Sequence, residues 1–292
     1  MIKGVRVRFP GSVITRWLIA LGNLTLTPFV LSGCSQLVPL PGGEFAFGVL
    51  GDTPYSQAEV EKLDGLIGRI NAHELAFVVH VGDIGTSGPA QGCSDAWLEA
   101  RKRQFARIRH PFVLLPGDNE WSDCREPRAR LERWRQLFCT AIPGLELERQ
   151  AGETCENLRW QAGGMMFVGL NVPGRGRNPL GERDMKLVFE WLDESRALAE
   201  SRRAQKIFVF LHADPHFERN APGDGYARLR AVLATHAQWL KDRLVLVHGD
   251  THVYRDDQPL PGLRRIEPWG SPFVRGLRVS LRAGELLVES MP

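Results

Sequence analysis

The chain has 292 residues, of which 43% are hydrophobic, so it can bury a full core as one large domain or two small ones. Its 37 Lys and Arg residues outnumber its 34 Asp and Glu residues, but the first 33 residues carry four of the basic residues and none of the acidic ones. The rest of the chain is therefore close to neutral, which gives no signal of nucleic-acid binding.

The N-terminus has the pattern of a targeting segment. Four basic residues precede an apolar run from Trp17 to Leu31, which Asn23 and Pro28 interrupt. Such a run is too short to span a bilayer comfortably and is typical of a signal peptide. We therefore predict a signal peptide over residues 1–33.

The end of this segment, Leu31-Ser32-Gly33-Cys34, resembles the lipobox of bacterial lipoproteins. The resemblance implies cleavage before Cys34, lipidation of Cys34, and tethering to the bilayer of the bacterial cell envelope on its periplasmic side. Ser35 stands where Asp favours retention in the inner membrane, so the outer membrane is weakly favoured. The alternative is an ordinary signal peptide or membrane anchor with an unrelated cysteine. Residues 34–43 then form a linker, and residues 44–292 form one domain.

Four other cysteines remain, Cys93, Cys124, Cys139 and Cys155. An even number in an exported protein indicates two disulfides, for which three pairings exist. Cys93 and Cys124 each follow a Gly-Asp turn closely, which favours pairing them with each other and pairing Cys139 with Cys155. The absence of a Cys-x-x-Cys pair disfavours a zinc–thiolate site.

Strands and helices alternate after residue 44. Apolar residues recur at helical spacing in five segments, residues 56–72, 94–108, 127–139, 182–201 and 226–241. Ser56, with Glu59 three residues later, has the capping-box pattern at the start of the first segment. The alternation predicts an α/β layered fold. Residues 156–172 and 263–289 contain short apolar pieces between Gly-rich turns, which predicts a second, more antiparallel sheet.

Four apolar strands end directly in Gly-Asp, and a fifth strand ends in a histidine. The residues concerned are Asp52, Asp83, Asp118, Asp250 and His212, and His252 follows the last Gly-Asp. A carboxylate near an apolar sheet edge is costly unless something compensates its charge. Residues just past the carboxyl ends of strands converge in open α/β sheets, so these six side chains indicate a cation site.

The order of these motifs resembles that of the calcineurin-like metallophosphoesterases, over nearly the whole chain beyond the linker. That family carries Asp-x-His, Gly-Asp, Gly-Asn-His-Asp/Glu, a lone His and Gly-His-x-His. Here the same order reads Gly51-Asp52-Thr53-Pro54, Gly82-Asp83, Gly117-Asp118-Asn119-Glu120, His212 and Gly249-Asp250-Thr251-His252. The resemblance implies a four-layer α/β/β/α sandwich of two mixed sheets flanked by helices. It also implies hydrolysis of a phosphoester substrate, in which a metal-activated hydroxide attacks phosphorus.

The resemblance also implies a ligand set for one or two divalent ions. Asp83 bridges the two ions, Asp52 and His252 bind one, and His212 binds the other. Asp118 takes the place of a ligating Asn and Asp250 that of a ligating His, while Pro54, at a third ligand position, leaves room for water or Tyr55. This oxygen-rich set favours Mn, Mg, Ca or Fe over Zn.

Asn119 stands where the family has a His that contacts phosphate and protonates the leaving group. A carboxamide can bind phosphate but cannot donate a proton usefully, so His216 is a candidate proton donor, with His248 as an alternative. If the register slips by one residue, Asn119 becomes a ligand and Glu120 the acid. Arg175 and Arg177 follow a strand and are candidate phosphate contacts.

The four carboxylates also affect the expected activity. A more negative set of ligands makes bound water less acidic, which predicts weak catalysis at neutral pH or an alkaline optimum. The alternative from another functional class is a degenerate, non-catalytic relative that holds a metal ion and binds a ligand at the envelope. Pro54 and Asn119 support this alternative, since they remove one ligand and the proton donor.

Overall fold

The computed structural model describes residues 44–152, 154–174, 182–218 and 225–291. The predictions for the signal peptide, Cys34 and the linker, and those for Arg175 and Arg177, lie outside the described residues. Of the helices in the described ranges, none is both long and apolar enough to cross a membrane.

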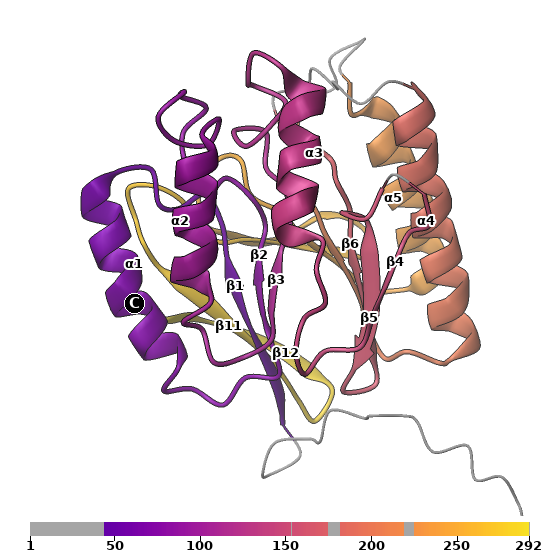
Figure 1. The fold of residues 1–292 in the computed structure, drawn as a ribbon. Helices are drawn as coiled ribbons and strands as arrows, with labels where there is room; N and C mark the ends of the chain where they lie inside the picture. The colour runs from indigo at the N-terminus through magenta and orange to yellow at the C-terminus, as the bar shows by residue number, and fades with distance from the viewer. Residues whose placement is uncertain (1–43, 153, 175–181, 219–224, 292) are drawn as a thin grey trace, which may run out of the picture. The chain divides into compact units, whose positions relative to one another are not determined.

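Two mixed sheets lie at the centre of the fold, with helices on their outer faces (Figure 1). The first sheet has the strand order β12 (Glu285–Met291), β11 (Gly276–Arg282), β1 (Phe45–Leu50), β2 (Val78–His80) and β3 (Phe112–Leu114). The second has the order β4 (Leu147–Arg149), β5 (Leu158–Ala162), β6 (Met165–Gly169), β7 (Ile207–Phe210), β8 (Leu244–Val247), β10 (Leu263–Glu267) and β9 (Arg255–Leu260).

Parallel pairing runs through the middle of each sheet. Strands β1, β2 and β3 are parallel to one another, and so are β6, β7, β8 and β10. The antiparallel strands do not form a sheet of their own, so that prediction was wrong. The hairpins β5–β6 and β9–β10 belong to the seven-stranded sheet, whereas β11–β12 extends the five-stranded one. Hairpin chemistry defines a pair of strands but not the sheet edge to which the pair adds.

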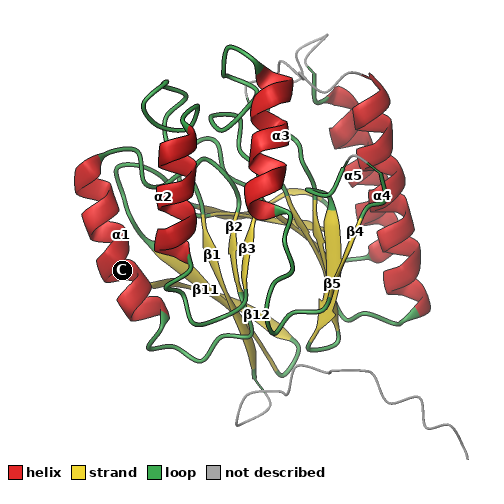
Figure 2. Cartoon of the chain, in the orientation of Figure 1, coloured by secondary structure: helices red, strands yellow, loops and turns green. Residues whose placement is uncertain are grey.

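Five helices occur at the predicted positions, α1 (Gln57–Ile70), α2 (Asp95–Phe105), α3 (Pro127–Phe138), α4 (Glu182–Ser201) and α5 (Ala227–Leu240). The five helices lie outside the strands (Figure 2). Buried apolar residues pack α1 and α2 on the five-stranded sheet and α4 and α5 on the seven-stranded one, while α3 contributes to both clusters. The result is the predicted four-layer α/β/β/α sandwich. Ser56 caps α1, but the Glu59 carboxylate accepts from the N–H of Tyr55 rather than from that of the cap.

Aromatic rings fill the space between the two sheets. Phe47, from the five-stranded sheet, packs edge-on against Phe167 and Phe208 of the other sheet, with centroids 5.4 and 5.1 Å apart. Each buried ring of this size stabilises the fold by about 1.5–3 kcal/mol. This inner core holds the two sheets face to face, so the loops that follow β1, β2, β3, β7 and β8 meet.

Two disulfides join loops and helix ends in the favoured pairing. We call Cys93–Cys124, with a Cα–Cα distance of 5.7 Å, the loop disulfide, because it links the segments that follow β2 and β3. We call Cys139–Cys155, with a Cα–Cα distance of 5.9 Å, the helix-end disulfide, because Cys139 is the C-cap of α3.

Candidate metal centre

The strand-end carboxylates surround the imidazole of His212. Its Nε2 atom lies 3.4 Å from Asp83 Oδ1, 3.4 Å from Asp118 Oδ1 and 3.9 Å from Asp250 Oδ1. Ligand atoms of Asp52, Asp83 and His212 lie within 4.8 Å of one another, as do those of Asp118, His212 and Asp250. The structure thus brings together five of the six predicted ligands in two overlapping groups that share His212.

The sixth predicted ligand, His252, lies beside the cluster and contacts its Asp52 carboxylate. Its Nε2 lies 3.6 Å from Asp52 Oδ1, and its Nδ1 lies 2.8 Å from the carbonyl oxygen of Ser271. His212 is oriented in the same way, since its Nδ1 lies 3.1 Å from the carbonyl oxygen of Val81. A carbonyl at one ring nitrogen fixes the tautomer and aims the other nitrogen, as in metal-binding histidines.

The backbone around the cluster is tightly constrained. Four of the predicted ligands are in the left-handed region, with φ of 52° at Asp52, 60° at Asp83, 79° at Asp250 and 63° at His252. This conformation costs roughly 1–2 kcal/mol for a residue other than glycine and concentrates at functional sites. A Cβ atom on Gly174 would lie 2.4 Å from Asp250 Oδ1, so this backbone must also approach the carboxylates closely.

Burial and mutual repulsion dominate the electrostatics. Burial raises the pKa of Asp52, and it raises the pKa of Asp83 well above its usual value, with a further contribution from Asp118. Burial alone would lower the pKa of His212, but the carboxylates of Asp83 and Asp118 raise it well above its usual value. Burial therefore disfavours the ionised form of Asp52 and Asp83, which a bound cation would favour.

The residues fit a divalent cation. Asp52 Oδ2 and His212 Nε2 are buried and have no hydrogen-bond partner among the described residues, although buried polar atoms are normally paired. The donor set is rich in carboxylate oxygens, which suit hard divalent ions. Asp52, Asp83, Asp118, His212 and Asp250 are the side chains that would hold one, with His252 at the edge beside Asp52.

Asn119 and Tyr55 form a triangle with Asp83. The Tyr55 hydroxyl donates to Asp83 Oδ2 at 2.5 Å, and the Asn119 amide lies 2.6 Å from the same oxygen and 3.0 Å from the hydroxyl. Burial and the charge of Asp83 raise the pKa of Tyr55, so the hydroxyl stays protonated and acts as a donor. Both side chains thus lie directly at the carboxylate that the resemblance assigns to the bridging position.

Glu120 has a positioning role that the sequence did not indicate. Its buried carboxylate accepts from the backbone N–H groups of Asp83 at 3.1 Å, Ile84 at 2.5 Å and Gly117 at 2.7 Å. Burial, partly offset by these bonds, raises its pKa to about 7. It therefore ties two of the Gly-Asp loops together. The signal that could have revealed this is a carboxylate three residues after the Gly of a strand-end turn, the spacing at which it reaches back to that Gly N–H.

His80 ties the first two Gly-Asp loops together and was also missed. It lies at the end of β2, where its Nδ1 accepts from the N–H of Gly82 at 3.2 Å and its Nε2 lies 3.0 Å from the carbonyl oxygen of Thr53. Because Nδ1 accepts, Nε2 carries the proton and donates to Thr53. Burial lowers the pKa of His80 to about 3, which keeps the ring neutral.

His216 lies in the loop after His212 and faces Asp214. Its Nδ1 lies 3.2 Å from Asp214 Oδ2, its backbone N–H donates to Asp214 Oδ1, and its side chain is 21% exposed. Asp214 in turn lies 3.5 Å from the guanidinium of Arg255, which also contacts Glu267. Glu267 accepts from the N–H and hydroxyl of Thr251 and so holds the Asp250–His252 loop.

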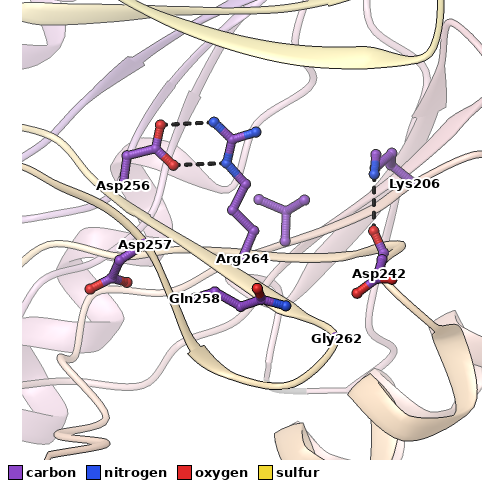
Figure 3. A pocket seen from close by; sticks show the side chains of 8 residues that line it. Lys206, Asp242, Asp256, Asp257, Gln258, Gly262 and Arg264 are labelled. Atoms are coloured by element: carbon purple, nitrogen blue, oxygen red, sulfur yellow. Dashed lines mark hydrogen bonds and ion pairs between the residues drawn. The ribbon is translucent and has the colours of Figure 1, made fainter.

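A large cavity lies at the opposite end of the strands. It has a volume of about 390 Å³, and Lys206, Asp242 and Gly262, which line it, come just before β7, β8 and β10 (Figure 3). The Lys206 ammonium donates to the carbonyl of Asp242, and Arg264 forms two bonds with Asp256. The metal-binding cluster lies past the other ends of the same strands, so this cavity is not part of the candidate metal centre.

Solved structures with a similar fold share this architecture. A dimetal phosphatase from Danio rerio has a TM-score of 0.59 at 15% identity, with 84% of this chain and 95% of that chain covered. A putative 5'-nucleotidase from Staphylococcus aureus has a TM-score of 0.50 at 18% identity, with 85% of this chain and 54% of that chain covered. The present chain thus spans about half of the nucleotidase. No protein-family model and no curated protein matches the sequence.

The strand order, the layers and these neighbours define the class: the chain has the calcineurin-like metallophosphoesterase fold. Within that fold, its buried Asp and His groups indicate divalent-metal binding.

Proposed function

We propose that this protein is a metal-dependent phosphoester hydrolase. The observation that supports this most strongly is the buried set of strand-end carboxylates around His212 Nε2, a ring nitrogen that has no hydrogen-bond partner among the described residues. A divalent ion bound there would supply the chemistry that phosphoester hydrolysis needs, activating water and neutralising phosphate oxygens.

The side chains around the cluster have separate tasks in this proposal. The Asn119 amide, which hydrogen-bonds to Asp83 and Tyr55 in this structure, would donate to a phosphate oxygen of the substrate. Tyr55 remains a neutral donor at the same carboxylate. Asp214 orients the imidazole of His216, the candidate proton donor to the leaving group. Unchanged turnover in a His216→Ala variant would show that His216 is not the proton donor.

The decisive test combines metal analysis with turnover. Purified protein that begins after Cys34 would be loaded with Mn²⁺ or Mg²⁺ and assayed on simple phosphate mono- and diesters, with and without chelator. Turnover should disappear with chelator and in Asp83→Asn. The control is Asp64→Asn, on α1, where the carboxylate pairs with Arg107 and accepts from the side chain of Gln104, away from the cluster. Chelator-insensitive turnover, or full activity in Asp83→Asn, would refute the proposal.

A non-catalytic metal-binding relative is the second candidate. The observation that favours it is that the Asn119 amide is already satisfied by Asp83 and Tyr55, while Pro54 offers no ligand. One tightly held ion with no hydrolysis across the ester panel would support it. Two ions with chelator-sensitive turnover would support the enzyme.

We further propose that the protein is anchored to the bacterial envelope through a lipidated Cys34. The support is the Leu31-Ser32-Gly33-Cys34 sequence after a short apolar run. Full-length protein expressed in a Gram-negative host should incorporate labelled palmitate and sediment with the outer membrane. A Cys34→Ser variant should incorporate no label, and equal labelling of both proteins would refute the anchor.

A further inference from the structure

Two large apolar side chains are exposed next to the candidate metal centre. Val253 is 55% exposed and Phe273 is 54% exposed, whereas most apolar side chains of the described residues are buried. We call these two residues the apolar rim. The other large hydrophobic residue found exposed in the described chain, Trp239, lies on α5, where the guanidinium of Arg196 covers its ring at 4.4 Å.

The apolar rim is connected directly to the metal-binding loops. Val253 follows His252 in the chain, and the carbonyl oxygen of His252 accepts from the N–H of Gly270 at 3.3 Å. Phe273 belongs to the same turn, since its N–H donates to the carbonyl of Gly270 at 2.9 Å. The carbonyl of Ser271, also in this turn, holds His252 Nδ1. Both exposed side chains are thus within two residues of a contact that orients a predicted ligand.

Hydrogen bonds from Ser271 also fix the turn that carries Phe273. The N–H of Ser271 donates to the carbonyl of Asp52 at 2.8 Å, and the hydroxyl of Ser271 donates to Glu59 at 2.8 Å. The ring of Tyr55 packs edge-on against that of His252, with centroids 5.0 Å apart. The exposed apolar side chains therefore belong to loops that hydrogen bonds link to the predicted ligands Asp52 and His252.

We propose that the apolar rim binds the organic group of the substrate, and that the preferred substrates are phosphoesters of bulky apolar or aromatic alcohols. This inference rests on the proposed function, because a phosphoryl group at the metal centre is what brings the ester group beside His252. An apolar ester group that contacts Val253 or Phe273 removes apolar surface from water, and a small alkyl ester buries less of it. The apolar rim thus determines specificity without taking part in the chemistry.

The test compares two phosphonates that cannot be hydrolysed. Binding of phenylphosphonate and methylphosphonate to Mn²⁺-loaded protein would be measured by calorimetry for the wild type, Val253→Ser, Phe273→Ser and the control Trp239→Ser. We expect about a tenfold preference of the wild type for phenylphosphonate, a contrast of the size that one apolar contact surface provides. Each rim variant should reduce this ratio at least threefold with unchanged Mn²⁺ content, while Trp239→Ser should retain it.

The possible failures are distinguishable. Equal binding of the two phosphonates by the wild type, or a ratio that survives in both rim variants, would overturn the apolar rim while leaving the phosphoesterase proposal standing. No binding of either phosphonate, together with no chelator-sensitive turnover, would overturn both. If phosphatidylglycerol vesicles bind the wild type but not Phe273→Ser, and the phosphonate ratio is unchanged, the apolar surface would belong to a membrane contact and the proposal would fail.

Discussion

A His80→Gln substitution should make the stability of the protein less sensitive to acid. His80 is fully buried, and its neutral ring accepts from Gly82 and donates to Thr53. A second proton on the ring would point an N–H at the N–H of Gly82, and burial disfavours the charge as well. Burial accordingly lowers the pKa of His80 to about 3 from its usual 6.5. The folded state therefore keeps His80 neutral at pH values at which the unfolded chain protonates it.

The sign and size of the effect follow from this difference. Above pH 6.5 both states are neutral, and the contribution of His80 to stability is fully present. As the pH falls from 6.5 towards 3, the unfolded state gains the proton first and stability is lost. At pH 4.5, two units below the unfolded pKa, the loss is about 2.7 kcal/mol. Gln does not titrate, and at neutral pH the substitution should cost about 2 kcal/mol for two altered hydrogen bonds.

The assay is urea unfolding of metal-free wild type and His80→Gln at pH 7.5 and 4.5. The difference between the two proteins should fall from about 2 kcal/mol at the higher pH to about zero or a slight reversal at the lower one. His73→Gln, in the exposed turn after α1, is the control and should stay within about 0.5 kcal/mol of the wild type at both pH values. A His80→Gln penalty that is the same at both pH values would refute the reasoning.

Three further predictions concern the metal centre. Replacing either disulfide by two serines should lower the free energy of unfolding by about 3–4 kcal/mol. Only removal of the loop disulfide should also weaken Mn²⁺ binding in calorimetry, because its sulfur atoms lie 3.5 and 3.8 Å from the carbonyl oxygen of Asn119. Equal weakening of Mn²⁺ binding on removal of either disulfide would contradict this prediction. Gly174→Ala should abolish Mn²⁺ binding, since the new methyl group would overlap Asp250. The control is Gly68→Ala in α1, where a new methyl group would have no atom within 4 Å. This variant should bind Mn²⁺ normally, and its free energy of unfolding in urea should rise by about 0.5–1 kcal/mol. The rate of ester hydrolysis should rise towards alkaline pH in a kinetic pH profile, and a maximum well below neutrality would count against a site with four carboxylates.

The helices and the gathering of strand-end residues could be predicted from the sequence. Each helix carries its own evidence in apolar spacing, as in residues 182–201, which form α4. The convergence of Asp52, Asp83 and His212 follows from a general property of parallel strands, so it needed no knowledge of strand order. The disulfide pairing was predictable for the same reason, because Cys93 and Cys124 follow neighbouring parallel strands.

Non-local properties could not be predicted in the same way. The sheet to which β11 and β12 belong depends on pairing with β1, more than two hundred residues away. The central position of His212 between two ligand groups depends on how the sheets face each other. His80 resembles any other strand residue until the fold places the carbonyl of Thr53 within hydrogen-bond distance of its Nε2 atom.

The metal-binding cluster is divided between the two sheets. Asp52, Asp83 and Asp118 follow strands of the five-stranded sheet, and His212 and Asp250 follow strands of the seven-stranded one. An ion held by both sets would be a removable crosslink across the sandwich, in addition to the aromatic core. Metal at a thousand times its dissociation constant would stabilise the folded protein by about 4 kcal/mol. The melting temperature should therefore report metal loading even for a variant that turns over no substrate.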